Sequence, residues 1–257
     1  MATRSAPSSF AVLPASREEL ARRIQLAREA VEEREARPPL RLVAGELDAL
    51  LEPFRRPLRR LDIPRAAAPR TVMLLPGFAT HPVRMRYLAR QLERAGHKVK
   101  RWGLGFNFGP TEENIAYLEA RLEEIHARYG REVVLVGWSL GGLFARELAK
   151  RRPELVAKVV TMGTPFSGSP RANNAWRIYQ FVAGHRVDEP PIRTDVTEKP
   201  PVETVALWSA RDGVISPRCA RGLPGERDRA IALRCTHLGF NYAPEAIHAV
   251  LRELDRG

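Results

Sequence analysis

The sequence lacks the long apolar runs and the paired cysteines that mark several protein classes. No run of about 18 consecutive apolar residues occurs, so no membrane-spanning helix is predicted. The first 20 residues contain no apolar stretch long enough for a secretory signal, and a cytoplasmic location is the expectation. The two cysteines, Cys219 and Cys235, form no Cys-x-x-Cys pair, which argues against a zinc or thioredoxin-like site. Free thiols are favoured over a disulfide between them.

Patterns for cofactor, metal and nucleic-acid binding are also missing. The sequence has neither a Gly-x-Gly-x-x-Gly pattern nor a phosphate-binding loop with its lysine, and no Asp/His cluster has metal-ligand spacing. We therefore expect no cofactor and no catalytic metal. The formal net charge is +12, but the arginines are scattered through the chain and no nucleic-acid module is recognisable. Nucleic acid is therefore not an expected partner.

Residues 1–68 are interpreted as an N-terminal helical extension, of which residues 1–15 are expected to be unstructured. Ser16 and Glu19 form a capping box, and apolar residues at helical spacing predict a helix that ends near Arg37, before two prolines. These apolar residues are Leu20, Ile24, Ala27 and Val31. Residues 40–51 predict a second helix. A surface appendage packed on the core is the favoured interpretation.

A basic stretch follows the second predicted helix of the extension. Its arginines are Arg55, Arg56, Arg59, Arg60 and Arg65. They leave a peripheral membrane contact or a protein partner open as the role of this region. The sequence carries no indication of the oligomeric state.

From Thr71 onward, apolar strand-like runs alternate with amphipathic helices. Strands are predicted within residues 71–75, 97–102, 132–136, 155–162, 202–208 and 230–234. Helices are predicted over residues 83–95, 112–129, 140–150 and 244–254. This alternation is typical of an α/β fold, a mainly parallel central sheet with helices on both faces, so residues 69–257 are predicted to form one domain. Ligands of such sheets bind beyond the carboxyl ends of the strands.

A Gly-x-Ser-x-Gly motif at residues 137–141 carries the strongest chemical signal. It follows an apolar, β-branched run directly and leads directly into a helical pattern. The chain must turn sharply there, and side chains at Gly137 or Gly141 would collide with the neighbouring chain. Ser139 is therefore the candidate nucleophile. The alternative is a structural turn in another doubly wound fold.

With this motif in its strand–turn–helix setting, residues 71–254 resemble the α/β-hydrolase superfamily, and within it the bacterial lipases and esterases. The resemblance implies the α/β-hydrolase fold and a serine hydrolase. It also implies a catalytic triad in the chain order serine, aspartate, histidine.

A serine nucleophile needs a base near neutral pH, and His237 is the candidate. It follows the last predicted strand and precedes the final helix, which is where the superfamily places its base. The other histidines lie at helix ends, in loops or on the last helix: His81, His97, His126, His185 and His248.

The base needs a carboxylate that fixes its tautomer and stabilises the imidazolium. Asp212 follows an apolar strand and precedes Gly213, which permits a tight turn. The order Ser139, Asp212, His237 is that of the superfamily. Asp228 and Glu226 are the alternatives, although both lie in a charged loop. Ordinary Asp-Gly turn chemistry also remains open for Asp212.

An oxyanion hole requires two backbone N–H donors. The resemblance implies Leu140, which follows the nucleophile, as one donor. Phe78, in the loop after the first strand of the domain, is the other. Pro76 stands where the superfamily's usual pattern has a histidine.

Residues 163–169, Gly-Thr-Pro-Phe-Ser-Gly-Ser, resemble a stretch that many lipases carry after the corresponding strand, with Phe166 in place of a histidine. That stretch usually leads into a lid, so residues 170–201 are a candidate lid, and a plain surface insertion is the alternative. Its larger apolar and aromatic residues suit an apolar acyl group: Trp176, Tyr179, Phe181 and Val182.

The sequence thus predicts hydrolysis of a small-molecule or lipid ester through an acyl-enzyme. Acyl transfer or thioester cleavage on the same triad is one alternative. A non-catalytic binding protein that keeps the fold is another.

Overall fold

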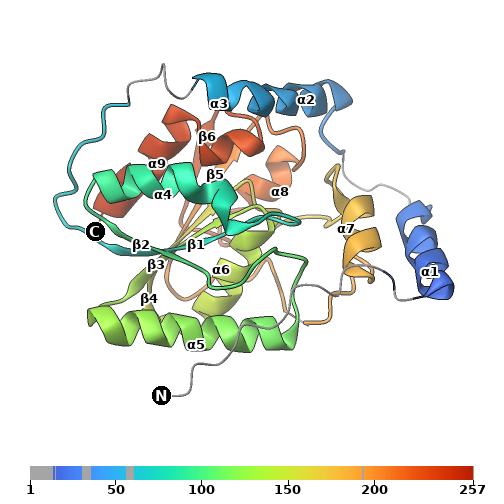
Figure 1. Cartoon of the computed structure of the whole chain (residues 1–257), viewed down its shortest axis with the longest axis horizontal. Helices are drawn as coiled ribbons and strands as arrows, with labels where there is room; N and C mark the ends of the chain where they lie inside the picture. The colour runs from blue at the N-terminus through green and yellow to red at the C-terminus, as the bar shows by residue number, and fades with distance from the viewer. Residues whose placement is uncertain (1–13, 15, 31–35, 56–60, 193, 257) are drawn as a thin grey trace.

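The computed structural model describes residues 14, 16–30, 36–55, 61–192 and 194–256 (Figure 1). Within them, a six-stranded sheet has the order β2-β1-β3-β4-β5-β6, and every neighbouring pair is parallel. The strands are β1 (Thr71–Leu75), β2 (Lys98–Arg101), β3 (Val133–Trp138), β4 (Val156–Met162), β5 (Glu203–Ser209) and β6 (Arg229–Leu233). This confirms the predicted α/β architecture.

Some helices precede the first strand in the chain, and the others lie between strands or follow the last one. The α-helices are α1 (Arg17–Arg28), α2 (Leu40–Gly45), α3 (Glu52–Arg55), α4 (Arg86–Arg94), α5 (Glu112–Tyr129), α6 (Leu140–Arg151), α7 (Trp176–Ala183), α8 (Pro217–Arg221) and α9 (Pro244–Asp255). The 3₁₀ helices are η1 (Glu46–Leu51), η3 (Pro82–Met85), η4 (Pro153–Leu155) and η5 (Leu238–Asn241). None of the helices in the described residues has both the length and the apolar composition needed to cross a membrane.

Two apolar layers cover the sheet because successive strand side chains point to opposite faces. Val72 and Leu74 of β1 pack with α4 and α9, whereas Met73 and Leu75 pack with α5 and α6. Figure 1 shows α4 and α9 on one side of the sheet and α5 and α6 on the other. All of β3 is buried, so the turn that follows it starts inside the core.

The first helix of the extension is shorter than predicted. It ends at Arg28, not near Arg37, and Glu29 already has an extended backbone (φ −51°, ψ 126°). Tertiary ion pairs explain the early end, because the Glu29 carboxylate binds Arg171 and Arg186. Some expectations fall outside the described residues: most of residues 1–15, Val31 and the arginines Arg56, Arg59 and Arg60.

We predict that Leu122→Ala lowers the free energy of unfolding by about 2–5 kcal/mol. Leu122 lies on α5 and is fully buried in the layer beneath the sheet. Chemical denaturation followed by circular dichroism measures the change. Leu47→Ala is the matched control, because Leu47 is 64% exposed and its truncation should change stability by no more than about 0.5 kcal/mol. Equal losses in the two variants would contradict this assignment of the core.

Candidate active site

The turn after β3 holds Ser139 in a strained conformation. Its φ is 54° and its ψ is −125°, a backbone region that residues other than glycine rarely adopt. A Cβ atom on Gly141 would lie 2.2 Å from the carbonyl oxygen of Leu75, and one on Gly137 would lie 2.4 Å from that of Gly141. The turn therefore packs directly on β1 and tolerates only glycine two positions before Ser139 and two positions after it. The Ser139 N–H donates to the Met162 carbonyl at 2.8 Å, which ties the turn to β4.

The loops after β5 and β6 bring Asp212 and His237 together. Nδ1 of His237 lies 2.8 Å from Oδ2 of Asp212, and both side chains are almost fully buried. The other oxygen of Asp212, Oδ1, accepts the N–H groups of Val214 at 2.8 Å and Ile215 at 2.7 Å. One oxygen of the carboxylate thus accepts hydrogen bonds within its own turn, and the other contacts the imidazole of His237. The two interpretations of Asp212 from sequence are therefore compatible.

The surroundings of His237 favour its protonated form. Burial by itself lowers the pKa of the imidazole, but the charge and hydrogen bond of Asp212 and the charge of Glu46 outweigh it, and the pKa is raised. A group that takes a proton during a reaction is assisted by such surroundings, because the imidazolium is stabilised as it forms.

Trp138, the last residue of β3, connects the serine turn to the histidine loop. Its indole N–H donates to the His237 carbonyl at 3.0 Å, and the two rings lie 5.5 Å apart between centroids. Within the described residues, no hydrogen bond joins the Ser139 hydroxyl to His237. Such bonds are often long before a substrate binds.

The competing residues from the sequence have other partners. Asp228 accepts from Lys199 and from the Thr204 N–H, and Glu226 accepts from the Leu223 N–H. Most of the other histidines bond to the backbone or to a tyrosine at other places in the fold: His81, His97, His185 and His248. These contacts leave Asp212 and His237, which follow β5 and β6, as the carboxylate–imidazole pair of the candidate site.

Gly163 shows why a glycine follows β4. Its φ is +56°, and a Cβ there would lie 3.0 Å from Oδ2 of Asp212 and 3.1 Å from Nδ1 of His237. The first residue of the lipase-like stretch therefore leaves space for the buried Asp–His pair.

The loop that carries Phe78 is fixed by a buried amide. The Asn107 side-chain amide donates to the Pro76 carbonyl at 2.7 Å, and the backbone carbonyl of Asn107 accepts from the Ala79 N–H at 2.7 Å. Phe78, Ser139 and Leu140 line the same cavity. The structure thus places both oxyanion-hole candidates beside the serine.

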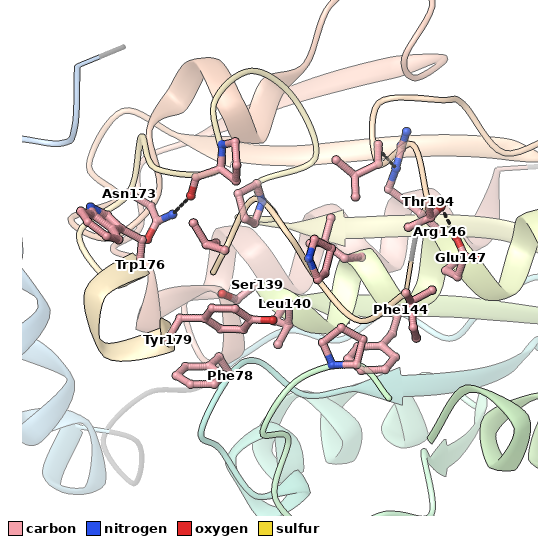
Figure 2. A pocket seen from close by; sticks show the side chains of 18 of the residues that line it. Phe78, Ser139, Leu140, Phe144, Arg146, Glu147, Asn173, Trp176, Tyr179 and Thr194 are labelled. Atoms are coloured by element: carbon pink, nitrogen blue, oxygen red, sulfur yellow. Dashed lines mark hydrogen bonds between the residues drawn. The ribbon is translucent and has the colours of Figure 1, made fainter. Parts of the chain in front are cut away.

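This cavity has a volume of about 380 Å³ and runs along α6 from Ser139 (Figure 2). Leu140, Leu143 and Phe144 form its floor, and Trp176 and Tyr179 of α7 lie over it. Tyr179 packs on Phe78 with ring centroids 4.9 Å apart. Two of the residues expected to contact a substrate from the candidate lid, Trp176 and Tyr179, therefore line the cavity.

A polar cluster lies at the end of the cavity away from Ser139. The Lys150 ammonium donates to Oγ1 of Thr194 at 2.6 Å, and the Thr194 hydroxyl donates to Glu147 at 2.5 Å. Glu147 is eight positions after Ser139 on α6, which is about 12 Å along a helix. The apolar part of the cavity therefore has a limited length.

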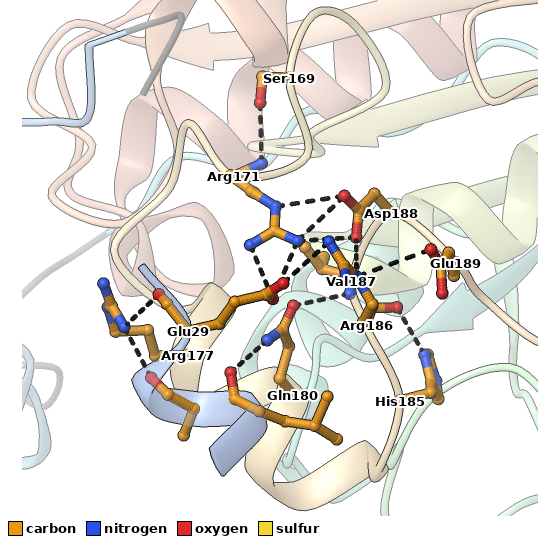
Figure 3. Close-up of polar contacts among 12 residues, drawn as sticks. Glu29, Ser169, Arg171, Arg177, Gln180, His185, Arg186, Val187, Asp188 and Glu189 are labelled. Carbon is orange, nitrogen blue, oxygen red and sulfur yellow. Dashed lines mark hydrogen bonds and ion pairs between the residues drawn. The ribbon is translucent and has the colours of Figure 1, made fainter. Parts of the chain in front are cut away.

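The N-terminal helix α1 braces α7 from outside (Figure 3). Arg171, before α7, lies between Glu29 at 3.2 Å and Asp188 at 2.9 Å. Arg177 of α7 donates to the Ala27 carbonyl at 2.7 Å, and the Gln180 amide donates to the Leu26 carbonyl at 2.6 Å. The extension thus holds the helix that covers the cavity.

Three buried residues of the site were not singled out from the sequence: Glu46, Asn107 and Gly163. Glu46 is 8% exposed and accepts hydrogen bonds from the loops of Asp212 and His237. No local signal marks it, because an acidic residue in a helical segment is ordinarily solvated. The lipase-like stretch that begins at Gly163 did indicate the right region.

Comparisons with known proteins agree with the fold. A family model described as "alpha/beta hydrolase fold" matches residues 70–184, which include Ser139. A pimeloyl-[acyl-carrier protein] methyl ester esterase of Aromatoleum aromaticum is 43% identical over 67 residues, which cover 26% of this chain and 24% of that protein. The matched segment thus spans about a quarter of the relative's length.

Solved structures extend the likeness to most of the chain. A Bacillus licheniformis lipase in its mature form has a TM-score of 0.55 at 18% identity, covering 77% of this chain and 96% of that one. A Paleococcus ferrophilus monoacylglycerol lipase has a TM-score of 0.53 at 18% identity, covering 77% and 99%. At this identity the likeness establishes the fold.

We predict that Asp212→Asn lowers the pKa of the His237 imidazole, because it removes the charge that counters burial. Nuclear magnetic resonance titration of the histidine ring nitrogens measures it. Asp228→Asn is the matched control, since Asp228 binds Lys199 and the Thr204 N–H, and should leave the pKa of His237 unchanged. An unchanged pKa in Asp212→Asn would contradict the pairing.

Proposed function

We propose that this chain, which a family model for the α/β-hydrolase fold matches over residues 70–184, hydrolyses carboxylic esters with Ser139 as nucleophile. The observation that carries the proposal is the strained Ser139, which opens onto an apolar cavity near a buried His237–Asp212 pair. His237 is the proposed base and Asp212 the group that orients it. No step of this chemistry calls for a metal or a cofactor.

The reaction proceeds in two halves. In the first, the Ser139 oxygen attacks the ester carbonyl while its proton moves to Nε2 of His237. The N–H groups of Phe78 and Leu140 bind the resulting oxyanion. Collapse breaks the bond to the alcohol, which leaves with the proton from His237. In the second half, water takes the place of the alcohol, and the acid is released.

The cavity suggests an ester with an apolar acyl group. Its walls are mainly apolar, and a chain bound along α6 would lie between Leu143 and the α7 aromatics. The names of the similar proteins support ester hydrolysis, since they include a methyl ester esterase and two lipases. The polar cluster of Glu147, Lys150 and Thr194 sets the upper limit on chain length.

We predict that Ser139→Ala lowers kcat for p-nitrophenyl esters by a factor on the order of 10⁴ to 10⁶, because no nucleophile remains. Product formation by wild type and variant is compared across a series of acyl chain lengths. Ser16→Ala, a change at an exposed N-cap, is the control and should retain activity.

Labelling with an organophosphonate separates the alternatives to ester hydrolysis. Labelled Ser139 without turnover of esters would favour acyl transfer or thioester cleavage. A folded wild-type protein that neither labels nor turns over would favour a binding protein and contradict the proposal.

We predict that Leu143→Trp shifts the preferred acyl chain toward shorter lengths. Leu143 lies one helical turn beyond Ser139 on the floor of the cavity, so a larger side chain there blocks the path along α6. The value of kcat/KM for an acetate ester should change little, while that for an octanoate ester should fall at least about tenfold, the discrimination of a few methylenes in an apolar pocket. Equal losses for both esters would place the acyl group elsewhere.

A further inference from the structure

The segment formed by α2 and η1 lies against the loops that carry Asp212 and His237. Glu46, the first residue of η1, turns its side chain inward and is 8% exposed. Its Oε1 atom accepts the N–H of Gly213 at 3.0 Å and the N–H of His237 at 2.7 Å. Its Oε2 atom accepts the N–H of Leu238 at 2.9 Å. One carboxylate thus connects the residue after Asp212 with His237 itself.

The backbone of the same segment packs on the aspartate turn. A Cβ on Gly213 would lie 2.4 Å from the carbonyl oxygen of Leu42, so the backbone of α2 is in direct contact with the aspartate turn. The Asn174 amide donates to the carbonyls of both Pro38, at 2.9 Å, and Gly213, at 2.8 Å. The contact at Gly213 therefore has three independent supports: a carboxylate, a close backbone approach and a bridging amide.

These contacts are stronger than those of an ordinary surface helix. A buried carboxylate is unfavourable unless hydrogen bonds compensate it, and here three backbone N–H groups do so. The same three N–H groups would lose their partner if the segment moved away. The hydrogen bonds therefore stabilise both the carboxylate and the two loops.

We propose that Glu46 is a positioning residue, which holds the loops of Asp212 and His237 at the separation where their side chains pair. Glu46 touches neither the cavity nor Ser139, so it acts through the other two residues. The kinetic consequence rests on the proposed ester hydrolysis, whereas the effect on His237 itself does not.

Charge distinguishes positioning from simple anchoring of the segment. Among the described residues, the charged groups that act on the His237 ring are Asp212, from the turn after β5, and Glu46, from η1. Two uncharged rings also lie close to it, those of Trp138 and Phe240, with centroids 5.5 and 6.4 Å away. Both carboxylates raise the pKa of His237 against the effect of burial. Removing one of them must therefore lower that pKa, which the loss of a remote anchor would not do.

The test compares Glu46→Gln, Glu46→Ala and the control Asp48→Asn in the full chain. Asp48 is an exposed carboxylate of the same helix that pairs with Arg55, so its removal matches the change in charge without touching the two loops. Glu46→Gln keeps one oxygen for two of the three N–H groups but turns an amide N–H₂ toward the third. For each variant, kcat, KM and the pH dependence of kcat/KM are measured, with active sites counted by phosphonate labelling.

We expect kcat per labelled site to fall by about tenfold to a hundredfold in Glu46→Ala, as for a misplaced catalytic group, and by less in Glu46→Gln. KM should change little, because the cavity is not altered. In Glu46→Gln the acid limb of kcat/KM should move to lower pH, because His237 then loses its proton more easily. Asp48→Asn should match the wild type in all three quantities.

Two results would overturn the proposal. In the first, Glu46→Gln leaves unchanged both kcat per labelled site and the acid limb of the pH profile of kcat/KM. The other is an unchanged titration of the His237 ring in the same variant, measured by nuclear magnetic resonance. The second readout needs no turnover, so it tests Glu46 even if wild type proves inactive on esters or Glu46→Ala fails to fold. A lower pKa of His237 in Glu46→Gln but not in Asp48→Asn would support the proposal in both of these cases.

Discussion

The absence of space beneath the serine turn is the constraint on which the site depends. Gly141 lies so close to Leu75 of β1 that no side chain fits, and the chain must leave β3 through the positive φ of Ser139. Such strain costs about 1–3 kcal/mol and persists only where the surroundings over-determine it. Here the bond from the Ser139 N–H to β4 and the burial of all of β3 do so. The direction of α6, and with it the floor of the cavity, follows from this turn.

The buried polar groups behind the serine form one connected set. Asp212 divides its oxygens between its own turn and His237, and Glu46 divides its oxygens among three backbone N–H groups. Each carboxylate is compensated by several hydrogen bonds, which is the condition for keeping a charge inside a protein. Trp138 then connects this set to the serine turn through the His237 carbonyl.

The N-terminal segments contribute to the site at two places far apart in the chain. Residues around Glu29 hold α7 over the cavity, and α2 with η1 holds the loops of Asp212 and His237. The family match begins only at residue 70, so the N-terminal residues that make these contacts lie outside the part of the chain that it covers. In this protein the extension therefore touches both the cover of the cavity and the residues behind the nucleophile.

Local periodicity, helix caps and glycines in the sequence predicted the strands, most of the helices and the position of Ser139. The sequence also selected His237 and Asp212 by their positions after strands, an inference from chain order. It overextended α1, since the ion pairs of Glu29 join residues more than 140 positions apart. Only the tertiary structure revealed Glu46, because hydrogen bonds to backbone N–H groups 167 to 192 residues away leave no local pattern. Long-range backbone contacts, unlike turns and helix faces, carry no signature in neighbouring residues.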